Sequence, residues 1–152
     1  SSPIEHPQPI ILDAKLRFPK SAKLVLPAAP KKPWIFTGLS CDDQRKRELE
    51  DLGAKVFMLD VDSLGHLSLP SLLSTLSEQS IRSLMVEGGA GVISSFLKSG
   101  LVDSFLLTIA PVYVGEDGIS AVQHAESAAK FDNISYHTLG RDVMMVAKQQ
   151  SK

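Results

Sequence analysis

The fold class follows from one stretch of the sequence, Leu84-Met85-Val86-Glu87-Gly88-Gly89-Ala90-Gly91-Val92-Ile93-Ser94-Ser95-Phe96. Its apolar beginning predicts a buried strand over Ser83–Glu87, and the residues after the glycines predict a helix over Gly91–Lys98. In open α/β sheets, ligands bind beyond the carboxyl ends of strands, where helix N-termini point free N–H groups outward. Gly88 and Gly89 carry no Cβ, so a phosphate group can approach the backbone closely there. The stretch therefore indicates an α/β fold with a candidate ligand site directly after a strand.

This glycine pattern is weaker than the well-defined phosphate-binding motifs. Gly88, Gly89 and Gly91 do not make a G-x-G-x-x-G, and G-x-x-x-x-G-K-[ST] does not occur in the chain. The spacing is also consistent with a tight turn between a strand and a helix, in which Glu87 is merely solvated. Both interpretations stay open on the spacing alone.

Strands and helices alternate in the middle of the chain, and strands close it. In the first part of the chain, periodicity and turn residues predict a strand over 9–12 that ends on Asp13, at most one short strand at Lys23–Leu26, and a strand over 34–37. A helix capped by Ser40, a strand over 54–59 and a helix over 69–78 are predicted to follow. After the strand and helix described above, the prediction is a strand over 102–110, an irregular or weakly helical segment around 120–130, and strands over 131–139 and 141–147. The alternation implies a parallel sheet covered by helices, and the closing strands imply an antiparallel edge. The predicted fold class is α/β.

Length and composition are those of one globular domain. The chain has 152 residues, of which 43% are hydrophobic and 22% charged. Its one cysteine, Cys41, excludes an intrachain disulfide and a cysteine-based zinc site. No apolar run reaches the roughly 18 residues that a membrane span needs. We therefore expect a cytoplasmic location and no membrane partner.

The net charge of −1 is unevenly distributed. Residues 1–47 hold nine of the 16 basic residues but only four of the 17 acidic ones. A basic first part suits a ligand that carries phosphate, and it is equally consistent with a solvated surface that happens to be basic. Nucleic acid is not favoured as a partner, because only 6% of the residues are aromatic and no basic stripe is interleaved with them.

Two separate groups of motifs carry a resemblance to a known family. The first group comprises Val86-Glu87-Gly88-Gly89, Ser95-Phe96-Leu97, Gly100-Leu101-Val102-Asp103 and Ala110-Pro111-x-x-x-Gly115, and the second is the stretch from His6-Pro7 through Ile10-Ile11-Leu12-Asp13 to Phe18-Pro19. Together they resemble the pyrimidine reductases of riboflavin biosynthesis, most nearly the fungal ones. The resemblance implies a dihydrofolate reductase-like fold, a three-layer sandwich with a mostly parallel central sheet and antiparallel C-terminal strands.

The resemblance also implies a reaction, a cofactor and a partner. Members of this family use NADPH to reduce a ribosylamino-pyrimidinone 5′-phosphate to its ribitylamino form. The hydride goes to C1′ of the opened ribose. Family members are usually homodimers, so we expect a second copy of the chain as the protein partner.

The same resemblance places individual residues. It implies that Asp13 and Glu87 contact the substrate. It implies that Gly88 and Gly89, with Ala90 next to them, contact the cofactor's phosphates. It also implies cofactor contacts for Thr37, at a position near the cofactor's adenosine end, and for Gly115, in a turn near the site. It assigns no catalytic residue and no metal site. For Asp13 the alternative is a local role, in which the carboxylate caps the next turn.

One part of the family pattern is absent. The family begins with a strand that carries a Ser-Leu-Asp-Gly-type motif and continues to an Asp-Asn-Pro-type loop, and no such residues precede His6-Pro7. We therefore expect residues 1–152 to be the C-terminal portion of one reductase domain, with residues 1–8 as a tail or linker. The alternative function is a truncated, non-catalytic α/β domain that folds or dimerises without turnover.

Overall fold

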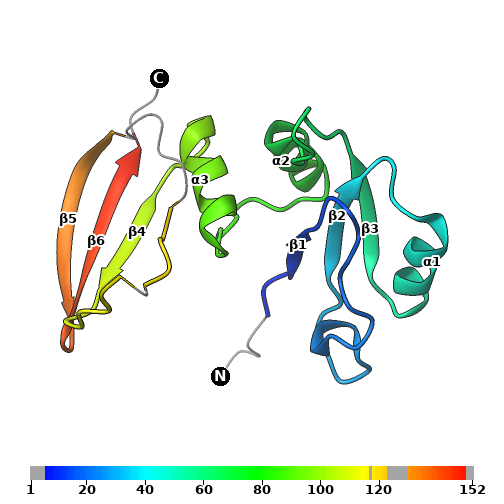
Figure 1. Ribbon diagram of the computed structural model, residues 1–152, viewed down its shortest axis with the longest axis horizontal. Coiled ribbons are helices and arrows are strands. Elements are labelled where there is room, and N and C mark those ends of the chain that lie inside the picture. The colour runs from blue at the N-terminus through cyan, green and yellow to red at the C-terminus, as the bar shows by residue number, and fades with distance from the viewer. Residues whose placement is uncertain (1–5, 117, 123–129, 150–152) are drawn as a thin grey trace. The chain divides into compact units, whose positions relative to one another are not determined.

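Three parallel strands form the sheet of the first half of the chain. They are β1 (Ile10–Leu12), β2 (Trp34–Gly38) and β3 (Lys55–Leu59), with β2 in the middle (Figure 1). Ile11 lies opposite Ile35, which in turn lies opposite Val56. The parallel pairing agrees with the long connections between these strands, residues 13–33 and residues 39–54, because parallel neighbours need a crossover of a dozen or more residues.

The structure is a computed structural model that describes residues 6–116, 118–122 and 130–149. It divides into two compact units, Ser1–Arg82 and Ser83–Lys152. Most of the predicted tail and most of the segment predicted around 120–130 lie outside the described residues. The assignment of residues 1–152 to one domain stays a prediction.

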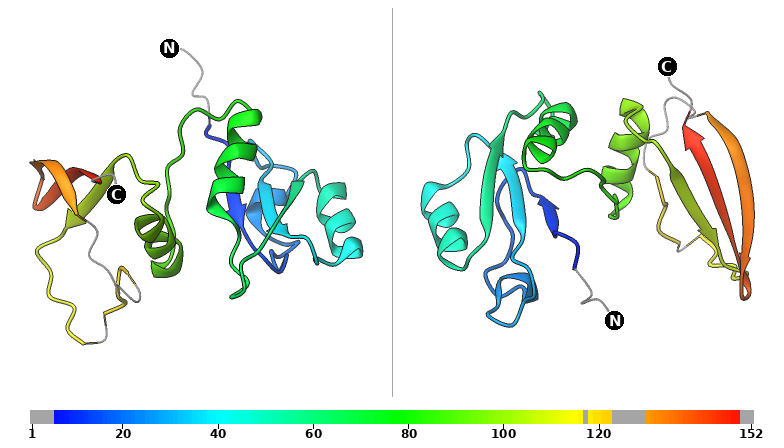
Figure 2. Two further views of the ribbon diagram at one scale, coloured as in Figure 1. Left: turned by 90° about the horizontal axis from the view of Figure 1, so that it is seen from above. Right: turned by 180° about the vertical axis from the view of Figure 1, so that it is seen from behind.

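Two helices cover the sheet of the first unit, α1 (Asp43–Asp51) and α2 (Leu69–Glu78), and they lie on its opposite faces (Figure 2). Leu49 of α1 has no exposed surface, and Leu72 and Leu76 of α2 are only 1% and 2% exposed. The bounds of α2 match the prediction, because its leucines recur at spacings of three and four and Ser68 caps it.

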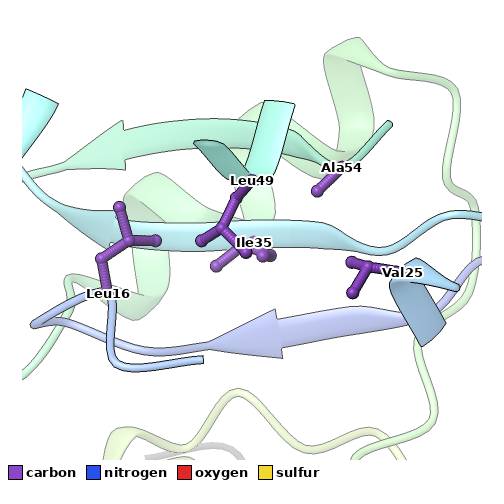
Figure 3. Packing of buried hydrophobic residues seen from close by; sticks show 5 residues of the cluster. All are labelled: Leu16, Val25, Ile35, Leu49 and Ala54. Atoms are coloured by element: carbon purple, nitrogen blue, oxygen red, sulfur yellow. The ribbon is translucent and has the colours of Figure 1, made fainter. Parts of the chain in front are cut away.

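The core between α1 and the sheet consists of five buried side chains, Leu16, Val25, Ile35, Leu49 and Ala54 (Figure 3). Ile35 lies on the central strand and has no exposed surface. Side chains from the loop after β1, the 3-10 helix Lys23–Val25, α1 and the turn before β3 thus pack against Ile35 of β2. This packing fixes the loops that follow the strands.

We expect Ile35→Ala to lower the free energy of unfolding by about 2–5 kcal/mol, because it removes buried methyl groups and leaves a cavity on the central strand. Urea denaturation followed by circular dichroism measures the change. Ile119→Ala is the control, since Ile119 is 97% exposed and its truncation should cost less than about 0.5 kcal/mol. Equal losses in the two variants would contradict this account of the core.

Two local predictions in the first unit are wrong. Lys23–Val25 is a 3-10 helix, η1, and not a strand, because its N–H groups bond to carbonyls three residues earlier instead of to a neighbouring strand. Asp42, and not Ser40, caps α1: its Oδ1 accepts the N–H of Arg45 at 2.9 Å. The chain is still in a turn at Ser40, since the N–H of Cys41 donates to the carbonyl of Gly38.

The described residues of the second unit form one helix and an antiparallel sheet. The helix is α3 (Ala90–Ser99), and the strands are β4 (Phe105–Ile109), β5 (Phe131–Leu139) and β6 (Asp142–Gln149) in the order β4-β6-β5 (Figure 1). The side-chain amide of Gln149 donates to the carbonyl of Leu97 and so ties β6 to α3. Parallel strands, helices and a closing antiparallel sheet make the fold α/β, as predicted.

The predicted strand over Ser83–Glu87 does not form. Exposure alternates along these five residues, as in a strand, but they belong to no helix or strand. A strand exists only where a neighbour takes up its N–H and C=O groups, and none of the described strands pairs with this segment. The strand predicted over 102–110 is also shorter than expected, since only Phe105–Ile109 pairs with β6.

Candidate functional site

Asp13 follows β1 and closes the loop after it. Its N–H continues the ladder by donating to the carbonyl of Phe36 at 2.9 Å. Its Oδ2 accepts the N–H of Phe18 at 2.6 Å, and its Oδ1 lies 4.0 Å from Nε of Arg17. The side chain is 12% exposed. One carboxylate oxygen therefore accepts a hydrogen bond within the loop, as the local alternative predicts. The other makes only a loose ion pair with Arg17.

Thr37 lies near the end of β2 and is fully buried. Its hydroxyl donates to the carbonyl of Ala14 at 3.3 Å, and the N–H of Gly38 donates to the same carbonyl at 3.0 Å. A Cβ on Gly38 would meet that oxygen at 3.0 Å and the side chain of Val61 at 3.2 Å. The hydroxyl of Thr37 thus holds the loop after β1 against β2, and its contact with a cofactor stays a prediction.

Glu87, Gly88 and Gly89 lead into α3, and all three are exposed. Gly89 is the N-cap of α3, with φ −67° and no hydrogen bond from a capping side chain. A Cβ on Gly89 would meet no atom within 4 Å, and one on Gly88 would make only ordinary contact with Val92 at 3.6 Å. Neither φ lies in the left-handed region. Neither backbone conformation nor packing within the described chain therefore requires these two glycines.

The helices α1, α2 and α3 differ at their N-termini. Asp42 caps α1, whose first turn also carries Asp43, and Ser68 caps α2. The first turn of α3 holds no acidic residue and no capping side chain. Since a helix N-terminus favours negative charge, α3 is the helix whose start is best suited to an anion.

Ala90 and Gly115 complete the set of predicted cofactor residues. Ala90 is the first residue of α3 and is 8% exposed, and its contact with a cofactor stays a prediction. Gly115 lies after β4 with φ +75°, and its carbonyl accepts the N–H of Gly118 at 3.3 Å. A turn with this φ by itself favours glycine. The place of Gly115 near a cofactor stays a prediction.

Sequence reasoning missed Arg45. This residue in the first turn of α1 donates from Nε to the carbonyl of Leu16 at 2.6 Å, and from Nη2 to the carbonyls of Phe18 at 2.8 Å and Arg17 at 3.2 Å. Main-chain carbonyls can belong to any residue type, so no sequence pattern marks this interaction. The side chains of Arg45, Asp13 and Thr37 thus all make hydrogen bonds to main-chain groups of the loop after β1.

Two carboxyl groups outside the predicted site have pKa values below their usual range. The hydrogen bond from Lys20 lowers the pKa of Glu48, and the hydrogen bond from the backbone of His66 lowers the pKa of Asp62. Both groups are on the surface. Within the described residues, no three His, Cys, Asp or Glu side chains come together as metal ligands would, and no helix is long and apolar enough to cross a membrane.

Comparison with known proteins gives consistent matches. The family model of the RibD C-terminal domain matches residues 2–145. The riboflavin biosynthesis protein RibD of Bacillus amyloliquefaciens is 41% identical over 113 residues, which are 74% of this chain and 29% of the relative. The 2,5-diamino-6-ribosylamino-4(3H)-pyrimidinone 5′-phosphate reductase of Candida glabrata is 29% identical over 97% of this chain and 59% of its own length.

Solved structures agree on the fold. The riboflavin biosynthesis reductase Rib7 of Saccharomyces cerevisiae matches 95% of this chain and 71% of its own, with a TM-score of 0.76 at 23% identity. This likeness confirms the predicted dihydrofolate reductase-like fold class. The family match covers nearly all of the sequence and the fold agrees with it, so the chain belongs to the family of the RibD C-terminal domain.

Proposed function

We propose that the protein that carries this chain is an NADPH-dependent reductase of riboflavin biosynthesis. Its substrate would be a ribosylamino-pyrimidinone 5′-phosphate, reduced to the ribitylamino form. Membership of the RibD C-terminal domain family supports this, as does the Candida glabrata relative named for the same reduction. The chain spans 29% and 59% of the first two curated relatives, so the activity is proposed for the whole protein.

The observation that carries the proposal is the open start of α3. Gly88 and Gly89 leave the backbone there uncovered by side chains, although neither their φ angles nor the packing around them requires glycine. In addition, no side chain caps the start of α3. We assign the backbone N–H groups at Gly89 and Ala90 to the phosphates of NADPH. When bound, NADPH supplies the hydride. The residues fit a phosphate because the helix start offers uncapped N–H donors and its first turn carries no acidic side chain.

The two predicted substrate-binding carboxylates have free acceptor capacity. Within the described part of the chain, no hydrogen bond or ion pair occupies the exposed carboxylate of Glu87, and only the loose pair with Arg17 at 4.0 Å faces Oδ1 of Asp13. We propose that both accept hydrogen bonds from hydroxyl or amino groups of the substrate. A carboxylate is a strong acceptor for such donors.

No general acid or base is assigned in this mechanism. Because the cofactor supplies the hydride chemistry, the protein's task is to bind both molecules, orient them and exclude water. Correct positioning can by itself account for a large part of the rate, since bound reactants no longer have to find one another in solution.

Calorimetric titration with NADPH is the direct test of the proposed cofactor. We expect saturable binding, with NADH as a comparison ligand that lacks the 2′-phosphate. The non-catalytic alternative predicts a folded chain without turnover. Absence of NADPH binding by the whole protein would contradict the proposed function.

We further propose that the protein is a homodimer. Large apolar side chains on one face of the β4-β6-β5 sheet support this, because Ile109, Tyr136 and Val143 are 52%, 65% and 39% exposed. Exposed apolar area of this kind favours association. Light scattering at high protein concentration is expected to give at least twice the mass of one chain, and a monodisperse monomer would contradict the prediction.

A further inference from the structure

The loop after β1 adopts a conformation that its sequence does not favour. We call residues 13–18 the Asp13 loop. Leu16, at its middle, has φ +51°, in the left-handed region that L side chains rarely adopt, and its side chain is fully buried in the core of the first unit. The N–H of Leu16 donates to the carbonyl of Asp13, and Oδ2 of Asp13 accepts the N–H of Phe18. The loop thus closes on Asp13 itself.

Arg45 supplies the support that comes from outside the loop. Its guanidinium binds the carbonyls of Leu16, Arg17 and Phe18, three consecutive residues of the loop, at 2.6, 3.2 and 2.8 Å. Its own position is set by the helix, because the N–H of Arg45 donates to the capping Oδ1 of Asp42 at 2.9 Å. A planar guanidinium with fixed donors suits such a set of carbonyls, which a lysine cannot reproduce.

The consequence concerns the direction of the Asp13 carboxylate. Oδ2 points back to Phe18, whose carbonyl Arg45 holds, so the position of Phe18 determines which oxygen of Asp13 remains available. Oδ1 is the oxygen that makes no close hydrogen bond in the described structure. If the loop were released, neither oxygen would keep a defined direction.

We infer that Arg45 is a positioning residue: it binds no substrate itself, and it fixes the Asp13 loop so that Oδ1 of Asp13 presents an acceptor to the substrate. The inference rests on the proposed function, because it gives Asp13 its role toward a substrate. It also makes a separate statement about the loop, which can be tested without any ligand.

The ligand-free test uses trypsin. Lys15 and Arg17 are exposed, so the bonds after them are chemically accessible, and only the rigidity of the loop protects them. In Arg45→Met we expect cleavage after these two residues to accelerate about tenfold under native conditions. The control is Arg47→Met, which removes an exposed arginine from the same helix and should leave cleavage at both sites unchanged. Peptide mapping by mass spectrometry identifies the sites.

The functional test is a double-mutant cycle on reductase turnover in the whole protein. Arg45→Met is expected to lower kcat/KM about tenfold or more, because a misplaced binding group is costly even when the chemistry is untouched. In an Asp13→Asn background the same change should cost less than about twofold, since the residue through which it acts is already altered. Arg45→Lys should recover part of the loss, as one ammonium group can still reach one carbonyl.

Each outcome decides the inference. Fast cleavage together with strong coupling to Asp13 supports it. If cleavage is fast but Arg45→Met lowers kcat/KM by the same factor with and without Asp13→Asn, the inference is overturned, because Arg45 would then contribute only to stability. Unchanged cleavage also overturns it. If Arg45→Met does not fold, Arg45→Lys carries the same comparisons with smaller effects. A wild-type protein that binds NADPH but has no turnover contradicts the proposed function instead, and with it any role of Arg45 toward a substrate.

Discussion

Glu87→Gln and Asp13→Asn are each expected to lower kcat/KM by about ten- to more than a hundredfold. Each change keeps the size of the side chain and removes the negative charge that accepts a hydrogen bond from the substrate. A hydrogen bond to a charged group contributes roughly 1.5–3 kcal/mol, and each 1.4 kcal/mol corresponds to about a tenfold change in rate. Steady-state kinetics with the pyrimidinone substrate measures the loss.

The affinity for NADPH should change little in both variants, because neither carboxylate is assigned to the phosphates. Asp13→Asn also preserves the fold, since the amide oxygen of asparagine can still accept the N–H of Phe18. Glu78→Gln, on an exposed helix end, is the control for loss of one negative charge. If a variant loses NADPH affinity in proportion to activity, its assignment to the substrate fails. If both variants keep full activity, neither carboxylate binds the substrate.

Gly89→Val is expected to weaken NADPH binding by about tenfold or more, which corresponds to at least about 1.4 kcal/mol. The added side chain would occupy the space that we assign to a phosphate at the start of α3. Calorimetric titration measures the affinity. Gly89→Ala adds a single methyl group and should give a smaller loss, so the two variants form a graded series.

The fold should survive both changes at Gly89. A Cβ at this position meets no atom within 4 Å, and φ is −67°, which any residue adopts. Thermal unfolding should therefore give nearly the wild-type Tm for both variants. Wild-type NADPH affinity in a well-folded Gly89→Val would contradict the assignment of the α3 N-terminus to the cofactor.

Elements with strong local signals were predicted well from the sequence. The helix Leu69–Glu78 has apolar side chains at helical spacing and a serine cap, and its bounds are those of α2. Likewise, the strand predicted over Phe131–Leu139 is β5, since a turn at Gly140 connects it directly to its partner β6. Both elements are defined by residues close together in the chain.

Features that depend on distant partners were predicted poorly. Ser83–Glu87 has the apolar composition of a strand, but sequence says nothing of whether a neighbouring strand is present, and none of the described strands pairs with it. The burial of Thr37 and its bond to Ala14 follow from how β1 and β2 meet. Arg45 gives no signal at all, because its partners are main-chain carbonyls.

The most direct test of the central claim is turnover by the whole protein with NADPH and the ribosylamino-pyrimidinone 5′-phosphate. We predict that NADPH is oxidised only when this substrate is present, with one ribitylamino product formed for each NADPH consumed. Mass spectrometry of the product identifies the reduction by the gain of two hydrogen atoms. A folded protein that binds NADPH but neither oxidises it nor forms this product would contradict the account.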